Sequence, residues 1–157
     1  LVRVTRHRRA SLMLRSKVFA AQRDGRIRVK LNDSAREFLD VVVEAVLRAE
    51  SDSEHAWHES LHRPITPEVE SDDPLRVFER QQILESNAGV MKETLSSPTI
   101  SLAEAWAWLA TLQVALRARC SEAGVSSDDD LLRASGEERE TIHALQFFLF
   151  ELTSAMV

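Results

Sequence analysis

The chain reads Arg-Asp-Gly-Arg-Ile-Arg-Val-Lys-Leu over residues 23–31 and Asn-Asp-Ser-Ala-Arg-Glu-Phe-Leu over residues 32–39. From Arg26 to Leu31 basic and apolar side chains alternate strictly, which is the period of a strand with one solvated and one buried face. Asp24-Gly25 is a strong signal for a tight turn. We therefore expect a β-hairpin over residues 16–31, with the turn at 23–25, and a change to helical period at residue 32.

Helical periodicity dominates the chain after the hairpin. An Asn32 or Asp33 cap opens the first helix, and Ser101 with Glu104 forms a capping box at the start of the third long helix. Proline is tolerated in the first turn of a helix, so Asp72-Asp73-Pro74 opens the second. The expected long helices cover about 33–50, 74 to Ser97-Pro98, 102 to about Gly124, and 135 onward, with short helices near 53–62 and 131–132.

The same periodicity predicts which side chains these helices bury. The expected buried stripes are, in helix order, Ala35, Phe38, Leu39, Val42, Val46 and Ala49; Phe78, Leu84, Ala88, Met91 and Leu95; Leu102, Trp106, Leu109, Leu112 and Leu116; and Ile142, Leu145, Phe148, Leu149 and Leu152. We predict a mainly α, single-domain helical bundle over 16–157, with the hairpin at 16–31 and the helical part at 32–157. A basic N-terminal arm, 1–15, precedes it.

Composition limits the class of protein. The chain has 157 residues, of which 44% are hydrophobic, and this is enough for one ordinary core. No apolar run approaches the ~20 residues of a membrane-spanning helix, so we expect no membrane partner. One cysteine among 157 residues is typical of a reducing compartment, and we expect a cytoplasmic protein. The first methionine is Met13, so the arm is also readable as an over-called leader.

Charge is distributed unevenly along the chain. The first thirty residues hold ten of the twenty Lys and Arg and one acid, Asp24, whereas the whole chain carries a net charge of −5. Such asymmetry is typical of a segment that meets a polyanion or an acidic protein surface. The candidate nucleic-acid or polyanion-binding residues are Arg23, Arg26, Arg28 and Lys30. The alternative is a solvated basic face paired with acidic helices of the same or a neighbouring molecule.

The order of these parts resembles a known family. The parts are Gly25-Arg-Ile-Arg-Val-Lys-Leu31, an acid-capped aliphatic helix, a helix headed by Asp72-Asp73-Pro74, and Leu102 to Arg119 with its tryptophans. The chain resembles the actinobacterial AosR-like family, mostly uncharacterised cytoplasmic proteins encoded near the ClpS adaptor, which includes a mycobacterial redox-responsive transcription regulator. The resemblance implies a non-enzymatic regulator.

The chain departs from that family in two ways. Members carry an Asn-Asp-x-Arg stretch after the Trp of the third helix, and here the corresponding stretch is Gln113-Val114-Ala115-Leu116. The redox regulator uses a disulfide within its chain, which a molecule with Cys120 alone cannot form. The resemblance therefore does not imply a redox switch.

Two further groups of residues could carry chemistry. His55, His58 and His62 would share one stripe of a helix over 53–62, and imidazole is a common ligand of zinc and nickel. The alternative is a solvated polar face, and we expect no metal and no other cofactor. Cys120 has two arginines within three positions, which could lower the pKa of its thiol, although free cysteines are more often small core residues.

Assembly is indicated by helices that are apolar around most of their circumference. Trp106 and Trp108 cannot share one narrow helix face, and Phe147, Phe148 and Phe150 cover more than half of the circumference of the last helix. We expect a protein partner and favour a homodimer that buries part of Trp108, Phe147 and the hairpin edge.

No hydrolase elbow, phosphate loop or zinc-protease motif occurs in the sequence, so we do not expect an enzyme. The first functional hypothesis is a cytoplasmic regulatory protein, acting in transcription through protein or nucleic-acid contacts. The alternative is an interaction module linked to protein turnover that binds no nucleic acid. A third hypothesis is a metal-dependent enzyme built on the histidine stripe.

Overall fold

The computed structural model describes residues 17–62 and 74–157, and the expected basic arm therefore lies outside the described residues. The described chain is mainly helical, as predicted, with a small antiparallel sheet. Its elements are β1 (Phe19–Ala21), β2 (Ile27–Val29), α2 (Asp33–Ser51), α3 (His58–His62), α4 (Pro74–Thr94), β3 (Thr99–Ile100), α5 (Leu102–Ala123), α6 (Asp128–Arg133) and α7 (Gly136–Met156). Of the helices in these two ranges, none has both the length and the apolar character needed to cross a membrane.

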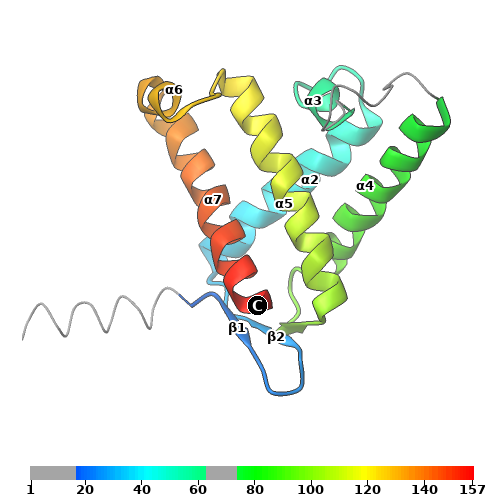
Figure 1. Ribbon diagram of the computed structural model, residues 1–157, viewed down its shortest axis with the longest axis vertical. Coiled ribbons are helices and arrows are strands. Elements are labelled where there is room, and N and C mark those ends of the chain that lie inside the picture. Colours follow the sequence, from blue (N-terminus) through cyan, green and yellow to red (C-terminus); the bar gives the residue numbers. More distant parts are fainter. Residues whose placement is uncertain (1–16, 63–73) are drawn as a thin grey trace, which may run out of the picture.

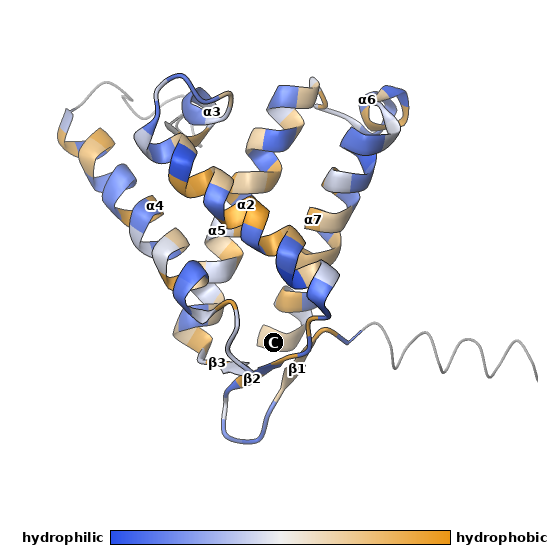
Figure 2. Ribbon diagram, turned by 180° about the vertical axis from the view of Figure 1, so that it is seen from behind, coloured by the Kyte–Doolittle hydropathy of each residue, from blue (hydrophilic) through white to orange (hydrophobic). Residues whose placement is uncertain are grey.

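Three long helices fan out from the sheet (Figure 1). Helix α5 lies in the middle and packs against α4 on one side and α7 on the other. Helix α2 crosses one face of this layer and contacts both α4 and α5 (Figure 2). The sheet lies at one end of the layer and the short helices α3 and α6 lie at the other, and buried side chains from the sheet and the long helices join in one contiguous core.

The predicted hairpin is present, but the sheet has a third strand that periodicity did not reveal. Strand β2 pairs with β1 on one side and with β3 on the other, with Arg28 opposite Ala20 in β1 and opposite Thr99 in β3. Val29 N also donates to Pro98 O at 2.9 Å. Strand β3 has two residues, which is too short to show an alternating pattern.

The inner face of the sheet rests on the helices of its own chain. Its side chains, Phe19, Ile27, Val29 and Ile100, are all buried. The Trp108 indole of α5 is fully buried against this face and meets the Phe19 ring edge-on, with 6.0 Å between the ring centroids. Its Nε1 donates to Thr94 Oγ1 at 2.7 Å, and that hydroxyl donates to Val90 O at 2.7 Å. Sheet, α4 and α5 therefore meet at one aromatic anchor.

The predicted helix ends are confirmed where capping residues marked them. Asn32 caps α2 through its side chain, which accepts from Ala35 N, and Ser101 with Glu104 forms the complete capping box of α5. Gly124 ends α5 in the left-handed region, at φ 69°, where a side chain would be strained. Ser135 caps α7, and its hydroxyl accepts from Glu138 N.

Some predicted details are wrong. Three side chains that were expected to be buried are exposed: Leu102, Trp106 and Phe78. Helix α5 is packed on several sides, and α4 has little contrast between an apolar and a polar face. The positions of the large side chains therefore did not identify the buried face of either helix. Small residues such as Ala105 and Ala115 are buried in α5 instead. The expected helix over 53–62 is reduced to α3, preceded by turns.

The buried indole of Trp108 gives a stability prediction. In the Thr94→Val variant the indole N–H of Trp108 is buried without its acceptor, which costs about 1–3 kcal/mol of unfolding free energy. Thr153→Val is the matched control, because the exposed Thr153 hydroxyl makes the same bond to a backbone carbonyl, at 2.7 Å from Leu149 O, and supports nothing else. Urea denaturation measures both. Equal stability of the two variants would contradict the proposed role of Thr94.

Candidate polyanion-binding face

The outer face of the sheet carries the predicted cations. Arg26, Arg28 and Lys30 alternate with buried residues along β2 and its flanks, so their side chains all lie on the solvent side, and all three are exposed. The neighbours of Arg28 across the ladder are Ala20 and Thr99, whose side chains are too small to cover a guanidinium group. The face is therefore basic and open.

Arg26 differs from its neighbours because it is tied into the fold. Its Nε donates to Thr99 Oγ1 at 3.1 Å, its Nη2 donates to Thr99 O at 3.5 Å, and Nη2 lies 3.9 Å from Glu104 Oε1. In the described parts of the chain, no ion pair involves Arg23, Arg28 or Lys30. Of the four predicted cations, Arg26 is therefore bonded to β3, and the other three make no ion pair with the described residues.

The turn places Arg23 at the tip of the hairpin. Gln22 N donates to Arg26 O at 2.8 Å and Gly25 N donates to Gln22 O at 3.1 Å, which closes a three-residue loop. Gly25 has φ 85°, as the last residue of such a loop requires. Asp24 Oδ1 accepts from the backbone of Arg26 at 2.9 Å, so the single acid of the hairpin is engaged within the turn.

The histidines do not form the predicted stripe. His55 lies in the turn before α3, where its Nδ1 accepts from Trp57 N at 3.1 Å, so it is not on the helix that carries His58. The Nδ1 atom of His58 lies 2.6 Å from Ala49 O. The side chain of His62 lies outside the described part of the structure, and among the described side chains no three His, Cys, Asp or Glu are arranged to hold a metal ion.

Cys120 lies near the end of α5 and is half-buried. Burial raises the pKa of its thiol, which is opposite in direction to the lowering that the neighbouring arginines could have produced and agrees with the alternative of a small core residue. Arg119 is engaged elsewhere, since its Nη1 lies 3.0 Å from Glu122 Oε2. The thiol is thereby held in its neutral, less nucleophilic form.

Because Cys120 is the one cysteine of the chain, alkylation can test the raised pKa of its thiol. Because thiolate is the reactive form, iodoacetamide should alkylate Cys120 more slowly in the folded protein than in the urea-unfolded chain at pH 8. The difference should narrow as the pH rises through the folded-state pKa, which lies above the ordinary one. Mass spectrometry measures both rates on the same residue. Faster alkylation of the folded form would contradict the assignment.

The two expected interface residues differ in their exposure to solvent. Trp108 is fully buried within its own chain, so its assignment to an interface is wrong. Phe147 is 41% exposed and stays a candidate. Sequence reasoning missed Trp106 and Phe150 as surface residues, at 59% and 71% exposed. Trp106 differs from the buried Trp108, and Phe150 from the buried Phe148, only in which side of the helix packs against the rest of the molecule.

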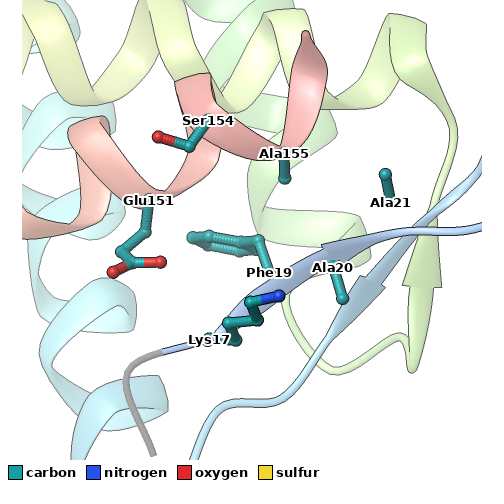
Figure 3. Close-up of a pocket in the computed structure, with 7 residues that line it drawn as sticks. All are labelled: Lys17, Phe19, Ala20, Ala21, Glu151, Ser154 and Ala155. Atoms are coloured by element: carbon teal, nitrogen blue, oxygen red, sulfur yellow. The ribbon is translucent and has the colours of Figure 1, made fainter. Parts of the chain in front are cut away.

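Sequence reasoning also missed a cleft between β1 and α7. Its lining residues are Lys17, Phe19, Ala20, Ala21, Glu151, Ser154 and Ala155, and its volume is about 300 Å³ (Figure 3). The two sides come from opposite ends of the chain. No local signal could have joined them.

Comparisons of the chain with protein-family models, with curated proteins and with solved structures found no match.

Proposed function

We propose that this chain is a non-enzymatic regulatory protein that binds a polyanion, with double-stranded nucleic acid as the favoured ligand, through the outer face of its sheet. The observation that carries the proposal is the open basic face of β2, on which Arg28 and Lys30 are exposed beside small side chains. Cations that neutralise phosphates release condensed counterions, and this supplies affinity without base contacts.

The spacing of side chains along the strand suits the phosphate backbone of a nucleic acid. Alternate residues of a strand stand about 7 Å apart on one face, so Arg28 and Lys30 can reach separate phosphates. Arg23 extends the same end of the molecule through the hairpin loop, which projects beyond the helices (Figure 1). Arg26 stabilises the platform through Thr99 and contributes less directly.

Charge separation supports an oriented approach. The hairpin end is basic, whereas α6 at the opposite end begins with Asp128, Asp129 and Asp130. A polyanion is attracted to one end of such a molecule and repelled from the other, which raises the rate of productive encounters. Binding would therefore be steered to the sheet.

The composition of the face favours a duplex over a single strand. Single-strand binding usually relies on aromatic side chains on which bases stack. The outer face offers Ala20, Gln22 and Thr99 beside its cations, while Phe19 is buried in the core. The expected mode is therefore backbone contact without sequence preference.

The test replaces Arg28 and Lys30 together with serine. Log affinity for mixed-sequence duplex DNA should fall linearly with log salt, and the slope should be less steep by about 2 in the double variant, because two phosphate-contacting cations are lost. Arg48→Ser combined with Arg133→Ser is the matched control, because both side chains are exposed and the net charge changes equally. Fluorescence anisotropy at several salt concentrations measures all three proteins.

Unchanged binding by the Arg28 and Lys30 variant would contradict the proposal, as would equal weakening by the control pair, since that would make net charge sufficient. The same holds if the original chain shows no salt-dependent binding.

An interaction module linked to protein turnover is the second candidate. It is favoured by an apolar groove of about 200 Å³ between α4 and α5, whose lining includes Ile83, Leu84, Ala110 and Val114. Ile83 is 62% exposed there. Partners captured from the native cell with this chain as bait distinguish the two functions, because nuclease treatment would remove partners bridged by nucleic acid and leave those bound in the groove.

A further inference from the structure

Strand β1 is the outer strand of the sheet as described, and its outer edge has a defined hydrogen-bonding pattern. Lys30 N donates to Val18 O at 2.7 Å and Gln22 N donates to Arg26 O at 2.8 Å, so Val18 and Gln22 turn backbone groups toward β2. In an antiparallel strand this direction alternates. The N–H and C=O groups of Phe19 and Ala21 therefore point away from the sheet.

Within the described residues, the strand itself carries none of the local features that block pairing at an edge. Natural edge strands are commonly blocked by proline, by charged side chains or by a bulge. Strand β1 consists of Phe-Ala-Ala, with none of these features. Because Ala20 and Ala21 are small, the backbone of another strand can approach without a clash.

A second exposed surface adjoins the edge. Phe147 and Phe150 on α7 each lie four residues, about one helical turn, before Glu151 and Ser154, which line the cleft beneath β1. The two rings are 41% and 71% exposed. The cleft adjoins the open edge, and the two rings lie about one helical turn away along α7. We call the edge, the cleft and the two rings together the β1–α7 surface.

We propose that the β1–α7 surface binds a second copy of this chain, with the two β1 strands paired antiparallel about a two-fold axis and the two α7 helices meeting through Phe147 and Phe150. A two-fold axis perpendicular to the sheet makes the two β1 strands antiparallel and keeps the same face of each sheet on the same side, so the edge is complementary to itself. The joined sheet has the order β3-β2-β1-β1-β2-β3.

Charge favours a second copy over an unrelated partner. The cleft carries a cation, Lys17, on its strand side and an anion, Glu151, on its helix side (Figure 3). Within the described chain neither takes part in an ion pair. A surface that carries both signs supplies the opposite charge to its own copy, whereas an acidic or basic partner would match half of it.

The surface area that each contact can bury shows which contacts the dimer needs. Phenylalanine buries about 150–250 Å² when fully enclosed, so the exposed parts of the two rings in both copies amount to only a few hundred Å². Stable interfaces bury about 1,200–2,000 Å² in total. The rings alone are insufficient, and the strand pairing and the cleft must contribute. Disrupting either part should therefore dissociate the dimer.

Self-association through the β1–α7 surface does not require polyanion binding. If both hold, the joined sheet places two copies of Arg28 and Lys30 on one continuous face, and a dimer would bind DNA more tightly than a monomer. If the protein binds no polyanion, the dimer is still expected.

The experiment is sedimentation velocity of the nuclease-treated full chain over a wide concentration range, at low and high salt. We expect a mass approaching twice 17.8 kDa at high concentration. The dimer should persist at high salt, because its strand pairing and ring contacts are not ionic, whereas association bridged by residual nucleic acid would be lost.

Two variants test the two parts of the surface. Ala21→Pro removes an outward N–H, which its own sheet does not use, and Phe150→Asp places a charge between the helices. Phe78→Asp is the matched control, because Phe78 is 56% exposed on α4. We expect both surface variants to be monomeric with unchanged circular dichroism, and the control to dimerise. If Ala21→Pro alters the fold, the Phe150 variant decides.

A monomeric original chain at every concentration would overturn the proposal. So would a dimer that dissociates in Phe78→Asp and persists in Phe150→Asp, since that would place the interface on α4.

Discussion

The contact between the inner face of the sheet and the Trp108 indole is the interaction on which the rest of the structure depends. A two-stranded hairpin is marginally stable by itself in water. Here Phe19, Ile27 and Val29 are buried against α5, and β3 adds a third strand on the other side of β2. Trp108 joins this face to α4 through Thr94, so the sheet is fixed to two long helices at once.

This packing explains how a short strand can present charge in a defined way. Because Ile27 and Val29 must face the core, Arg26, Arg28 and Lys30 have to face solvent, and a shift of one residue would bury the cations. Arg26 then secures the arrangement from outside by bonding Thr99 on β3. The basic face is thus a consequence of the core, and its cations are positioned before any ligand arrives.

The same packing separates the surfaces of the molecule. Strand β2 is enclosed on both edges, whereas β1 has one edge open beside α7. The outer face and the open edge are therefore next to each other but distinct, and a ligand on one does not obstruct the other. Polyanion binding and self-association could then reinforce each other, since a dimer doubles the available charge without changing either fold.

How much the sequence predicts depends on whether a signal is local. The alternation from Arg26 to Leu31 predicts the exposed cations, and the caps at Asn32, Ser101 and Ser135 predict where helices begin, because each signal lies within a few residues. Helical periodicity predicts that Trp106 is buried, whereas the structure buries Trp108. This could not be predicted, since it depends on which side of α5 faces the sheet.

The cleft between Lys17 and Glu151 was unpredictable for a related reason, because it joins residues from opposite ends of the chain. The two-residue β3 and the bond from Arg26 to Thr99 likewise need the tertiary structure.

Native-state hydrogen exchange tests the central claim, that the helical core holds the basic sheet rigid. The informative amides are those of Val29, which donates to Pro98 O, and Lys30, which donates to Val18 O. The account predicts that both exchange with an opening free energy close to that of the most protected amides of α5, since the sheet opens only when the core does. If both exchanged through a much cheaper local opening while α5 stayed protected, the hairpin would be an independent flap, and the account would be contradicted.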